Sequence, residues 1–334
     1  MLLAAPNQWV HLESGLAYDP DPSVLISKVI APDYCAKSTC PSFEAFLNDI
    51  FEKDQDLIPY VQRAVGYCLT GSTADQCLFI MIGDGANGKS TFVNVINRLL
   101  GDYSKAASSQ TLVAKGSSSI GDDLVNLVGA RLISVSETET GEALAEAKIK
   151  QMTGGDVLKG RPLYGSWLEF SIIGKILLAT NSLPQINNTD LGIWRRIQAI
   201  PFNRTFTAEQ QDKDLGGKLT KELPGILNWA IQGCLDWQEQ GLNPPQIVHD
   251  QVSAYKTEMD SIAQFVEQEC SLEPETKYPA SKLYEAYRHF CQAIGRKPQS
   301  TNAFKKALDK LTGVYQSRTS SGMQWSGIQP VMQF

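Results

Sequence analysis

Residues 83–90 read GDGANGKS, from Gly83 to Ser90. An apolar run, residues 77–82, precedes this loop, and residues 91–100 follow it with apolar side chains at helical spacing. A strand, a glycine-rich loop and a helix in this order are the context in which the pattern GxxxxGK[ST] indicates a phosphate-binding loop. Backbone N–H groups of such a loop point at phosphate, and the start of the helix adds positive potential. The sequence therefore predicts a nucleotide-binding site here.

The expected cofactors are ATP and Mg²⁺. The Lys89 ammonium should reach the β- and γ-phosphates, and the Ser90 hydroxyl should bind Mg²⁺. The residues predicted to contact the nucleotide are Gly83, Asp84, Gly85, Ala86, Asn87, Gly88, Lys89, Ser90 and Thr91. The alternative is a tight glycine turn in an ordinary strand-to-helix connection.

The composition is that of a globular protein. The chain has 334 residues, of which 43% are hydrophobic and 20% charged, so it can bury a sizeable core. No uninterrupted apolar run approaches the ~20 residues that a membrane helix needs, and the N-terminus lacks the basic region of a signal peptide. Seven cysteines without a regular framework indicate reduced thiols and a cytoplasmic setting. A membrane partner is not expected.

The net charge of −6 is unevenly distributed. Residues 275–334 contain nine Lys or Arg and three Asp or Glu, so this tail carries +6 and the rest of the chain −12. Such asymmetry indicates a basic module attached to an acidic body. Two helices and short β segments are expected in the tail, and Lys305, Lys306 and Arg318 are candidates for contacts with DNA phosphate. The alternative is a basic face that serves solubility or subunit packing.

Two apolar strands are followed by polar side chains that suit phosphate chemistry. Residues 130–136 run into Glu137, where a carboxylate could hold Mg²⁺ or polarise the attacking water. Glu139 could share this work or be a solvated loop acid. Residues 174–180 form the second strand, and Asn181 at its end could bind the γ-phosphate or the attacking water. The alternative for Asn181 is a plain turn residue.

Two pairs of cations are candidates for contacts with phosphate. Arg195 and Arg196 precede an apolar run, and either could stabilise transition-state charge on the γ-phosphate of a neighbouring subunit. Residues 157–164 could form a β-hairpin around a central glycine, with Lys159 and Arg161 near its tip. The alternatives are a surface arginine pair and a solvated loop.

The order and spacing of these patterns resemble those of superfamily 3 helicases, which are AAA+ ATPases of small viruses, phages and plasmids. Within this group the sequence is most similar to the helicase portion of phage and plasmid primase–helicases. The resemblance extends from about residue 10 to about residue 320. The segments that carry it are residues 66–71 (GYCLTG), 83–90, 136–139 (SETE), 150–156 (KQMTGGD), 175–181 (KILLATN) and 192–202 (GIWRRIQAIPF).

The resemblance implies an α/β fold and a set of site residues. An AAA+ P-loop NTPase core, with a parallel sheet flanked by helices, would lie between an N-terminal helical domain and a C-terminal winged-helix-like domain. The expected domains are residues 1–70, 71–245 and 246–334. The catalytic residues implied are Lys89, Glu137, Asn181, Arg195 and Arg196, with Ser90 and Glu137 on the metal. Lys159 and Arg161 would lie on a DNA-binding hairpin in the central channel of a ring, and Lys305 and Lys306 would bind DNA in the C-terminal domain.

The function implied is an ATP-dependent DNA helicase that works in phage- or plasmid-type replication in a bacterial host cytoplasm. It would act as a ring, expected to be a homohexamer, on single-stranded or forked DNA, with a primase or polymerase as partner. Two alternatives stay open: an AAA+ replication initiator or loader without processive unwinding, and a P-loop kinase of small molecules. The sequence departs from the family in two respects. Ser136 stands where many AAA+ proteins have a second acid, and no recognisable primase segment precedes the helicase part, which suits either a stand-alone helicase or part of a longer protein.

Overall fold

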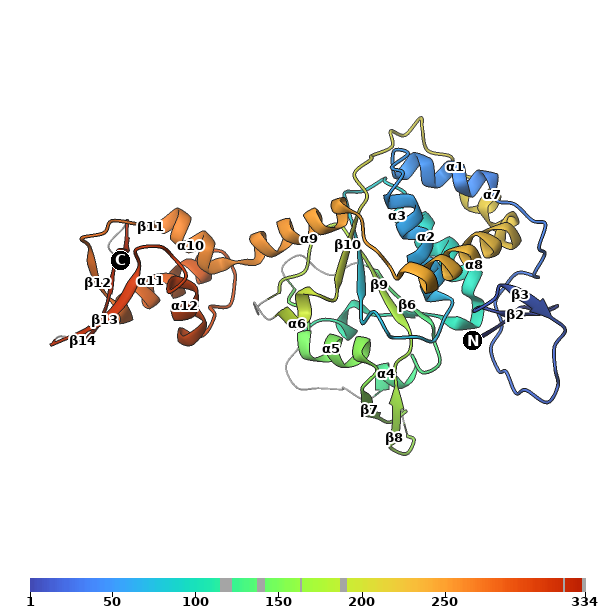
Figure 1. Cartoon of the computed structure of the whole chain (residues 1–334), viewed down its shortest axis with the longest axis horizontal. Coiled ribbons are helices and arrows are strands. Elements are labelled where there is room, and N and C mark those ends of the chain that lie inside the picture. Colours follow the sequence, from blue (N-terminus) through green and yellow to red (C-terminus); the bar gives the residue numbers. More distant parts are fainter. Residues whose placement is uncertain (115–121, 137–141, 163, 187–190, 321, 332–334) are drawn as a thin grey trace. The chain divides into compact units, whose positions relative to one another are not determined.

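The computed structural model describes residues 1–114, 122–136, 142–162, 164–186, 191–320 and 322–331. The chain divides into two units. Unit 1 comprises residues 1–184 and 191–252, and unit 2 comprises residues 185–190 and 253–334. Each unit has its own hydrophobic core. Figure 1 labels the helices and strands.

A five-stranded parallel sheet forms the centre of unit 1. Its strands, in spatial order, are β10 (Ile197–Pro201), β4 (Leu78–Ile82), β9 (Lys175–Thr180), β6 (Leu132–Ser136) and β5 (Ser104–Ala107). The three central strands are almost continuously buried, as strands that are covered on both faces are. The expectation of a parallel sheet flanked by helices, as in a P-loop NTPase core, is confirmed.

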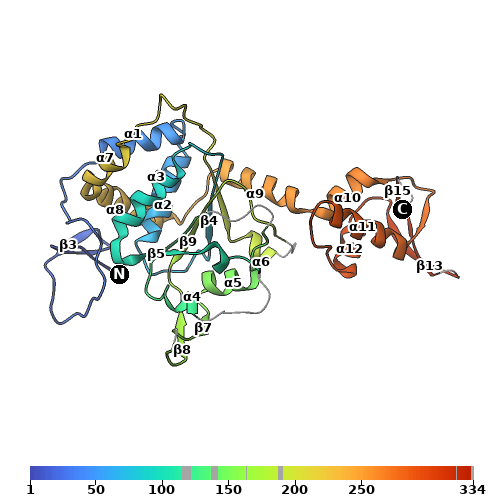
Figure 2. The same ribbon diagram turned by 180° about the vertical axis from the view of Figure 1, so that it is seen from behind.

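Helices cover both faces of this sheet (Figures 1 and 2). In both views α1, α2, α3, α7 and α8 lie on one side of the strands, and α5 and α6 lie on the other. The helices are α1 (Pro41–Ile50), α2 (Leu57–Cys68), α3 (Lys89–Leu100), α4 (Asp122–Val125), α5 (Glu146–Gly154), α6 (Leu191–Trp194), α7 (Leu215–Lys221), α8 (Leu223–Gln240) and α9 (Gln246–Met259). Short 3₁₀ turns are η1 (Gly101–Tyr103) and η2 (Ser109–Thr111). Helix α9 contains the boundary between the two units.

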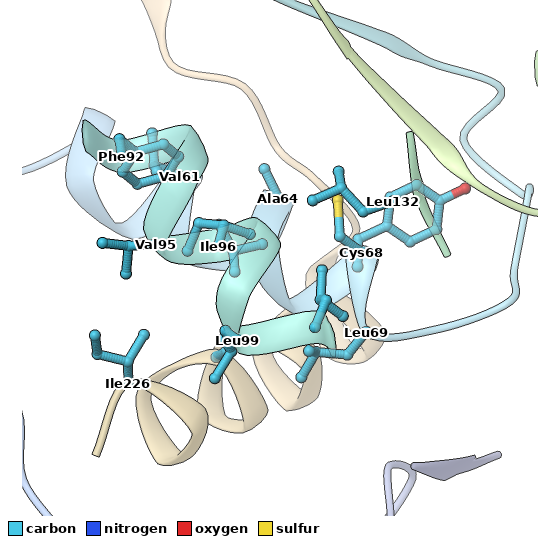
Figure 3. Close-up of a cluster of buried hydrophobic side chains, with 14 of the residues drawn as sticks. Val61, Ala64, Cys68, Leu69, Phe92, Val95, Ile96, Leu99, Leu132 and Ile226 are labelled. Carbon is cyan, nitrogen blue, oxygen red and sulfur yellow. The ribbon is translucent and has the colours of Figure 1, made fainter. Parts of the chain in front are cut away.

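Helix α3 packs within a cluster of buried hydrophobic side chains of this core (Figure 3). Phe92, Ile96 and Leu99 repeat at the spacing of one helix face, and all three are buried. They gather with side chains of α2, such as Val61, and of α8, such as Ile226. Because α3 begins at the end of the glycine-rich loop, this packing fixes the position of that loop.

Helices α2 and α8 approach each other closely because each has a glycine at the contact. A Cβ atom at Gly66 would lie 2.1 Å from the backbone nitrogen of Cys234. A Cβ atom at Gly233 would lie 2.1 Å from the carbonyl oxygen of Gln62. Any other residue would push the helices apart in a close-packed core. This gives a physical reason for the first glycine of the GYCLTG segment.

The N-terminal part differs from the expected helical domain. Helices α1 and α2 form where apolar spacing predicts them, but residues 2–18 form an antiparallel meander of β1 (Leu2–Ala4), β2 (Trp9–His11) and β3 (Leu16–Tyr18). Its buried side chains, such as Leu3 and Val10, join the same core as α1, α2 and α3. Strands of three residues are too short to give an alternating pattern, so the sequence did not reveal them.

A buried lysine holds the connection between α2 and β4. The Lys175 side chain, at the start of β9, donates hydrogen bonds to the carbonyl oxygens of Thr70 and, at 3.3 Å, Ser72. Its ammonium also lies 4.7 Å from the centroid of the Tyr67 ring. Burial penalises the charged form and lowers the pKa of Lys175 from its ordinary 10.5 to about 8.

This lowered pKa predicts a pH-dependent stability. Between about pH 8 and pH 10.5 the unfolded chain keeps the Lys175 proton while the folded chain loses it, so the contribution of Lys175 to stability should rise with pH. Below about pH 8 the burial penalty is constant. Denaturant titration gives the free energy of unfolding of the wild type and of Lys175→Met at each pH. The value for the wild type minus that for the variant should therefore increase across this window, by about 1.4 kcal/mol for each unit by which folding lowers the pKa of Lys175. Lys105→Met, which replaces an exposed lysine, serves as control. If the difference from the wild type were independent of pH for both variants, Lys175 would not have the lowered pKa.

Outside the main sheet, β7 (Val157–Gly160) and β8 (Leu168–Ser171) form an antiparallel hairpin. The hairpin projects from the body of unit 1 in both views (Figures 1 and 2). A hairpin was expected here, but its turn lies between residues 160 and 168 rather than at Gly160. The second strand was not predicted, because residues 168–171 alternate too briefly to give a signal.

The described part of unit 2 contains the end of α9, further helices and short antiparallel strands. The helices are α10 (Ser261–Glu269), α11 (Ala280–Ala293) and α12 (Thr301–Leu308). The strands β12 (Lys277–Pro279), β14 (Gly322–Ser326) and β13 (Tyr315–Thr319) form one sheet in this order, and β11 (Cys270–Ser271) pairs with β15 (Gln329–Pro330). Phe265, Tyr287, Phe304 and Trp325 are among the large buried side chains of its core. In the part of the chain that the structure describes, no helix combines the length and apolar character needed to span a bilayer.

Candidate nucleotide-binding site

The loop between β4 and α3 is shaped by Gly83 and Asn87. A Cβ atom at Gly83 would lie 2.3 Å from the carbonyl oxygen of Phe202, so only glycine fits here. The buried Asn87 side chain donates to the carbonyl oxygens of Asp84 and, at 3.3 Å, Phe202. Its Oδ1 accepts from the Lys89 N–H at 3.3 Å. Asn87 therefore braces the loop from within, which the motif alone did not reveal.

The outer side of the loop suits an anionic ligand. Helix α3 begins at Lys89, directly after Gly88, so its first N–H groups and the positive end of its dipole lie at the loop. Asp84, Gly85, Ala86 and Ser90 are exposed there. The Ser90 hydroxyl is an oxygen donor of the kind Mg²⁺ accepts, together with phosphate oxygens and water. Within the described ranges, no cluster of three His, Cys, Asp or Glu side chains could hold a metal by itself.

Lys89 and Asn181, 92 positions apart, meet at this loop. The Lys89 side chain is only 6% exposed, and its Nζ donates to the carbonyl oxygens of Gly83 and, at 3.1 Å, Asp84. It also donates to Asn181 Oδ1 at 3.0 Å. Two of the predicted site residues therefore form one hydrogen-bonded group.

The strand order explains this meeting. Strand β9 lies between β4 and β6, and all three are parallel, so their carboxyl ends share one edge of the sheet. Ile82 at the end of β4 pairs with Thr180, and Ser136 at the end of β6 pairs with Ala179. The loop residues and Asn181 directly follow these strand ends. Glu137 and Glu139, predicted to act at this edge, lie outside the described residues.

Arg195 and Arg196 lie at the opposite end of the sheet. The Leu78 N–H, at the start of β4, donates to the carbonyl oxygen of Arg196 at 2.7 Å. At the other end of the same strand, the Phe202 N–H donates to the carbonyl oxygen of Ile82 at 2.7 Å. With a rise of about 3.3 Å per residue, the two ends of β4 are about 13 Å apart. The structure therefore does not bring the arginines to the loop of the same chain.

The two arginines differ in burial. Arg196 is 8% exposed, and its guanidinium donates to Thr153 Oγ1 at 3.1 Å and to the carbonyl oxygen of Gly192 at 2.6 Å. Arg195 is exposed. Thr153 belongs to the TGGD segment, so that segment anchors Arg196.

Sequence reasoning missed Gln76. Its Oε1 accepts from Arg195 at 2.6 Å and from Arg196 at 3.2 Å, so one side-chain oxygen holds both guanidinium groups. A single glutamine before a buried strand carries no recognisable pattern. Only the parallel pairing of β4 with β10 brings it to the arginines.

The predicted DNA-contacting cations lie on two separate elements. On the hairpin, Lys159 Nζ is 2.9 Å from Glu169 Oε1 on the paired strand, and the Arg161 guanidinium lies over the Trp167 ring, 5.6 Å from its centroid. In unit 2, Lys305 and Lys306 lie in the last turn of α12, and Arg318 lies on β13; all three are exposed. Lys159 thus has an acidic partner that the sequence did not reveal.

Two family profiles match separate parts of the chain. Residues 257–327, in unit 2, match the family described as Poxvirus D5 protein-like. Residues 81–196, from β4 to Arg196, match a family of unknown function (DUF5906). Among individual relatives, “Putative helicase L207/L206” of Acanthamoeba polyphaga mimivirus is 30% identical over 211 residues, which is 61% of this chain and 22% of that protein. Primase D5 of fowlpox virus is 25% identical over 151 residues, which is 44% of this chain and 19% of that protein.

These matches support a likeness to the D5-type helicases and primases of large DNA viruses. A further relative, “Putative helicase 022R” of Frog virus 3, is 26% identical over 269 residues, which is 75% of this chain and 28% of that protein. The chain thus spans less than a third of the length of these relatives. The resemblance to primase–helicases that was expected from the sequence is confirmed at this level.

The fold also has a counterpart among solved structures. The structure described as the apo structure of the NrS-1 C terminal region (305-718) superposes with a TM-score of 0.51, covering 98% of this chain and 84% of that one. The two sequences are only 12% identical, so the likeness is one of fold. The profile that matches residues 81–196 encloses Lys89, Asn181, Arg195 and Arg196.

Proposed function

We propose that this chain is the ATP-dependent helicase part of a DNA replication protein and that it works as a ring. The observation that carries the proposal is the group formed by Lys89 and Asn181 at the carboxyl edge of the sheet. A phosphate-binding lysine and a strand-end amide in contact supply the cation and the polar group that phosphoryl transfer requires. Relatives named as a putative helicase and as a primase make DNA the natural substrate.

The catalytic roles follow from this arrangement. When bound, Mg²⁺ would neutralise charge on the β- and γ-phosphates, with the Ser90 hydroxyl as a protein ligand. Lys89 would hold the phosphates and Asn181 would orient the attacking water or the γ-phosphate. Glu137, next in the sequence after Ser136, is proposed to polarise that water and to contribute to the metal site.

The position of the arginines supports a ring. Arg195 and Arg196 are about 13 Å away along β4 from the loop of their own chain. An arginine that stabilises the transition state would therefore have to come from a neighbouring subunit. Arg195, which is exposed, is proposed to be this arginine finger, and Arg196, which is buried, to brace it together with Gln76. A homohexamer is the proposed assembly.

DNA contacts are proposed on the hairpin and on unit 2. In unit 2 the elements follow one another in the order α10, β11, β12, α11, α12, β13 and β14. The strands β12, β14 and β13 form one sheet, and this combination of helices and a strand pair supports a winged-helix arrangement. Lys305 and Lys306 on α12 and Arg318 on β13 would then contact DNA phosphate. Origin in a phage or plasmid, a bacterial cytoplasm, and a primase or polymerase partner rest on the sequence resemblance alone.

The test is the rate of ATP hydrolysis with and without single-stranded DNA, on protein whose mass in solution is recorded at the same time. Stimulation by DNA in a hexamer-sized species is expected, followed by strand separation on a forked substrate. A monomeric ATPase that ignores DNA would contradict the proposal and favour a kinase of small molecules. Stimulation without strand separation would favour an initiator or loader.

A further inference from the structure

The segment that follows β10 lies against the glycine-rich loop. The Phe206 N–H donates to the carbonyl oxygen of Ala86 at 2.8 Å, and the Asn87 side chain donates to the carbonyl oxygen of Phe202 at 3.3 Å. Two hydrogen bonds therefore hold residues 202–206 along the loop. Because Ala86 is exposed, the first of these bonds lies on the outer side of the loop, which is the side that suits an anionic ligand.

Arg204 is held in a defined position on this segment. Its guanidinium carbon lies 4.6 Å from the centroid of the Phe206 ring, within the range of a cation–π contact. Its Nη1 donates to the carbonyl oxygen of Asp49 at 3.1 Å and to Asp49 Oδ1 at 3.3 Å. The Arg204 side chain is nevertheless 31% exposed. An aromatic ring and the last turn of α1 thus restrain a guanidinium group that still reaches solvent.

The Phe206 ring behind this guanidinium group is itself supported. It packs against the hydrophobic core of unit 1, and Gln211 Nε2 donates to the Phe206 carbonyl oxygen at 3.1 Å. The backbone of Phe206 is therefore held through both its N–H and its C=O. Exposed ion pairs contribute little to stability, because holding a long side chain in one geometry costs entropy. A restrained, partly exposed Arg204 beside the loop therefore favours a role in ligand binding.

The strand order gives the direction in which a nucleotide extends from the loop. Strands β9 and β10 flank β4 on opposite sides. Lys89 donates to Asn181 at the end of β9, so the γ-phosphate end of ATP lies toward β9 in the proposed site. The nucleoside end then extends toward β10, and the segment after β10 carries Arg204 and Phe206.

We infer that Arg204 stacks on the base of the bound nucleoside triphosphate, with Phe206 and Asp49 as the residues that position it. This inference rests on the proposed function and specifies the base subsite of the same nucleotide site. The guanidinium group is planar and stacks on flat π-systems, whereas the ammonium group of lysine is a compact point charge. Because stacking strength grows with the π-face of the base, purine triphosphates should bind more tightly than pyrimidine triphosphates.

The test compares two probes, a non-hydrolysable ATP analogue and inorganic triphosphate, which has the phosphates but no base. Calorimetric titration of the full chain gives the dissociation constant of each. Arg204→Ala should bind the ATP analogue roughly 2- to 30-fold more weakly, the range of a cation–π contact from an exposed to a desolvated site. Its affinity for inorganic triphosphate should be unchanged. In hydrolysis, KM for ATP should rise while kcat stays constant, because the base contact is the same in the ground state and the transition state.

Further variants separate stacking from charge. Arg204→Lys keeps the charge but loses the plane, so it should bind the ATP analogue as weakly as Arg204→Ala. Phe206→Leu removes the ring behind Arg204 and should weaken binding in the same direction. Arg98→Ala is the matched control and should bind like the wild type, because Arg98 is exposed, donates to Thr220 Oγ1 at 2.7 Å and lies in the last turn of α3, away from the loop. Thermal melting of each variant shows whether it is folded.

The outcomes distinguish this inference from the proposed function. If the wild-type chain binds neither the ATP analogue nor inorganic triphosphate, the nucleotide site and the proposed function fail together. If the wild type binds the analogue and Arg204→Ala binds it equally well, the base subsite is wrong while the proposed function stands. If Arg204→Ala weakens both probes by the same factor and Arg204→Lys restores both, Arg204 contacts phosphate, and stacking on the base is overturned.

Discussion

Replacing Lys89 with alanine is expected to lower the rate of ATP hydrolysis by about a hundredfold to a thousandfold or more, because one preorganised donor to developing charge is worth that much. Lys89 is buried beside the loop, and its ammonium is already held by the carbonyl oxygen of Asp84 and by Asn181. The phosphates would therefore lose a cation whose position is set by the protein. The measurement is phosphate release at saturating ATP.

The control for this variant is Lys105→Ala, which removes an exposed lysine from the edge strand β5 of the same sheet and should keep wild-type turnover. Asn181→Ala should also slow hydrolysis. Because Lys89 and Asn181 are in contact, the double variant should lose less than the product of the two single effects. Wild-type turnover in Lys89→Ala would remove the phosphate-binding role from this loop.

Local features of the fold could be predicted because local physics determines them. An apolar run, a glycine-rich loop and apolar residues at helical spacing were enough to locate β4 and α3, and the same reasoning found β6 and β9. Apolar residues at helical spacing after Pro41 predicted a helix with Ser42 as its N-cap, and α1 forms there but begins earlier, at Pro41 with Cys40 as N-cap. In each case the signal lies within about ten neighbouring residues.

Features that depend on pairing between distant segments could not be predicted. Nothing in the residues around Asn181 indicates that β9 lies beside β4, so the hydrogen bond from Lys89 emerges only from the strand order. Gln76 became a site residue for the same reason. The turn of the β7–β8 hairpin was misplaced because a glycine suggests a turn locally, whereas the pairing of Lys159 with Glu169 extends the strand through Gly160.

The two arginines show how burial divides residues that the sequence leaves equivalent. Arg195→Ala is expected to lower hydrolysis by about a thousandfold or more while ATP still binds and the melting temperature is unchanged, since the exposed Arg195 is proposed as the finger. Arg196→Ala should instead lower the stability, by about 1–3 kcal/mol, because the oxygen atoms of Gly192 and Thr153 lose a buried donor. Nucleotide-binding titrations and thermal melting separate the two effects. Equal behaviour of the two variants in all three measurements would contradict this division.

Mixing two inactive proteins tests whether Arg195 acts on a neighbour. In a mixed ring, a protomer with Arg195→Ala still supplies Lys89, and a protomer with Lys89→Ala still supplies Arg195. Interfaces that combine these two intact residues are complete, so mixing should restore part of the hydrolysis that neither protein shows alone. The control is a mixture of Lys89→Ala with Lys105→Ala, a variant that should keep wild-type turnover. In this mixture the activity should simply be proportional to the fraction of Lys105→Ala protomers. Because the arginines lie at the far end of β4 from the loop, no recovery in the first mixture would mean that Arg195 supports the fold rather than the reaction.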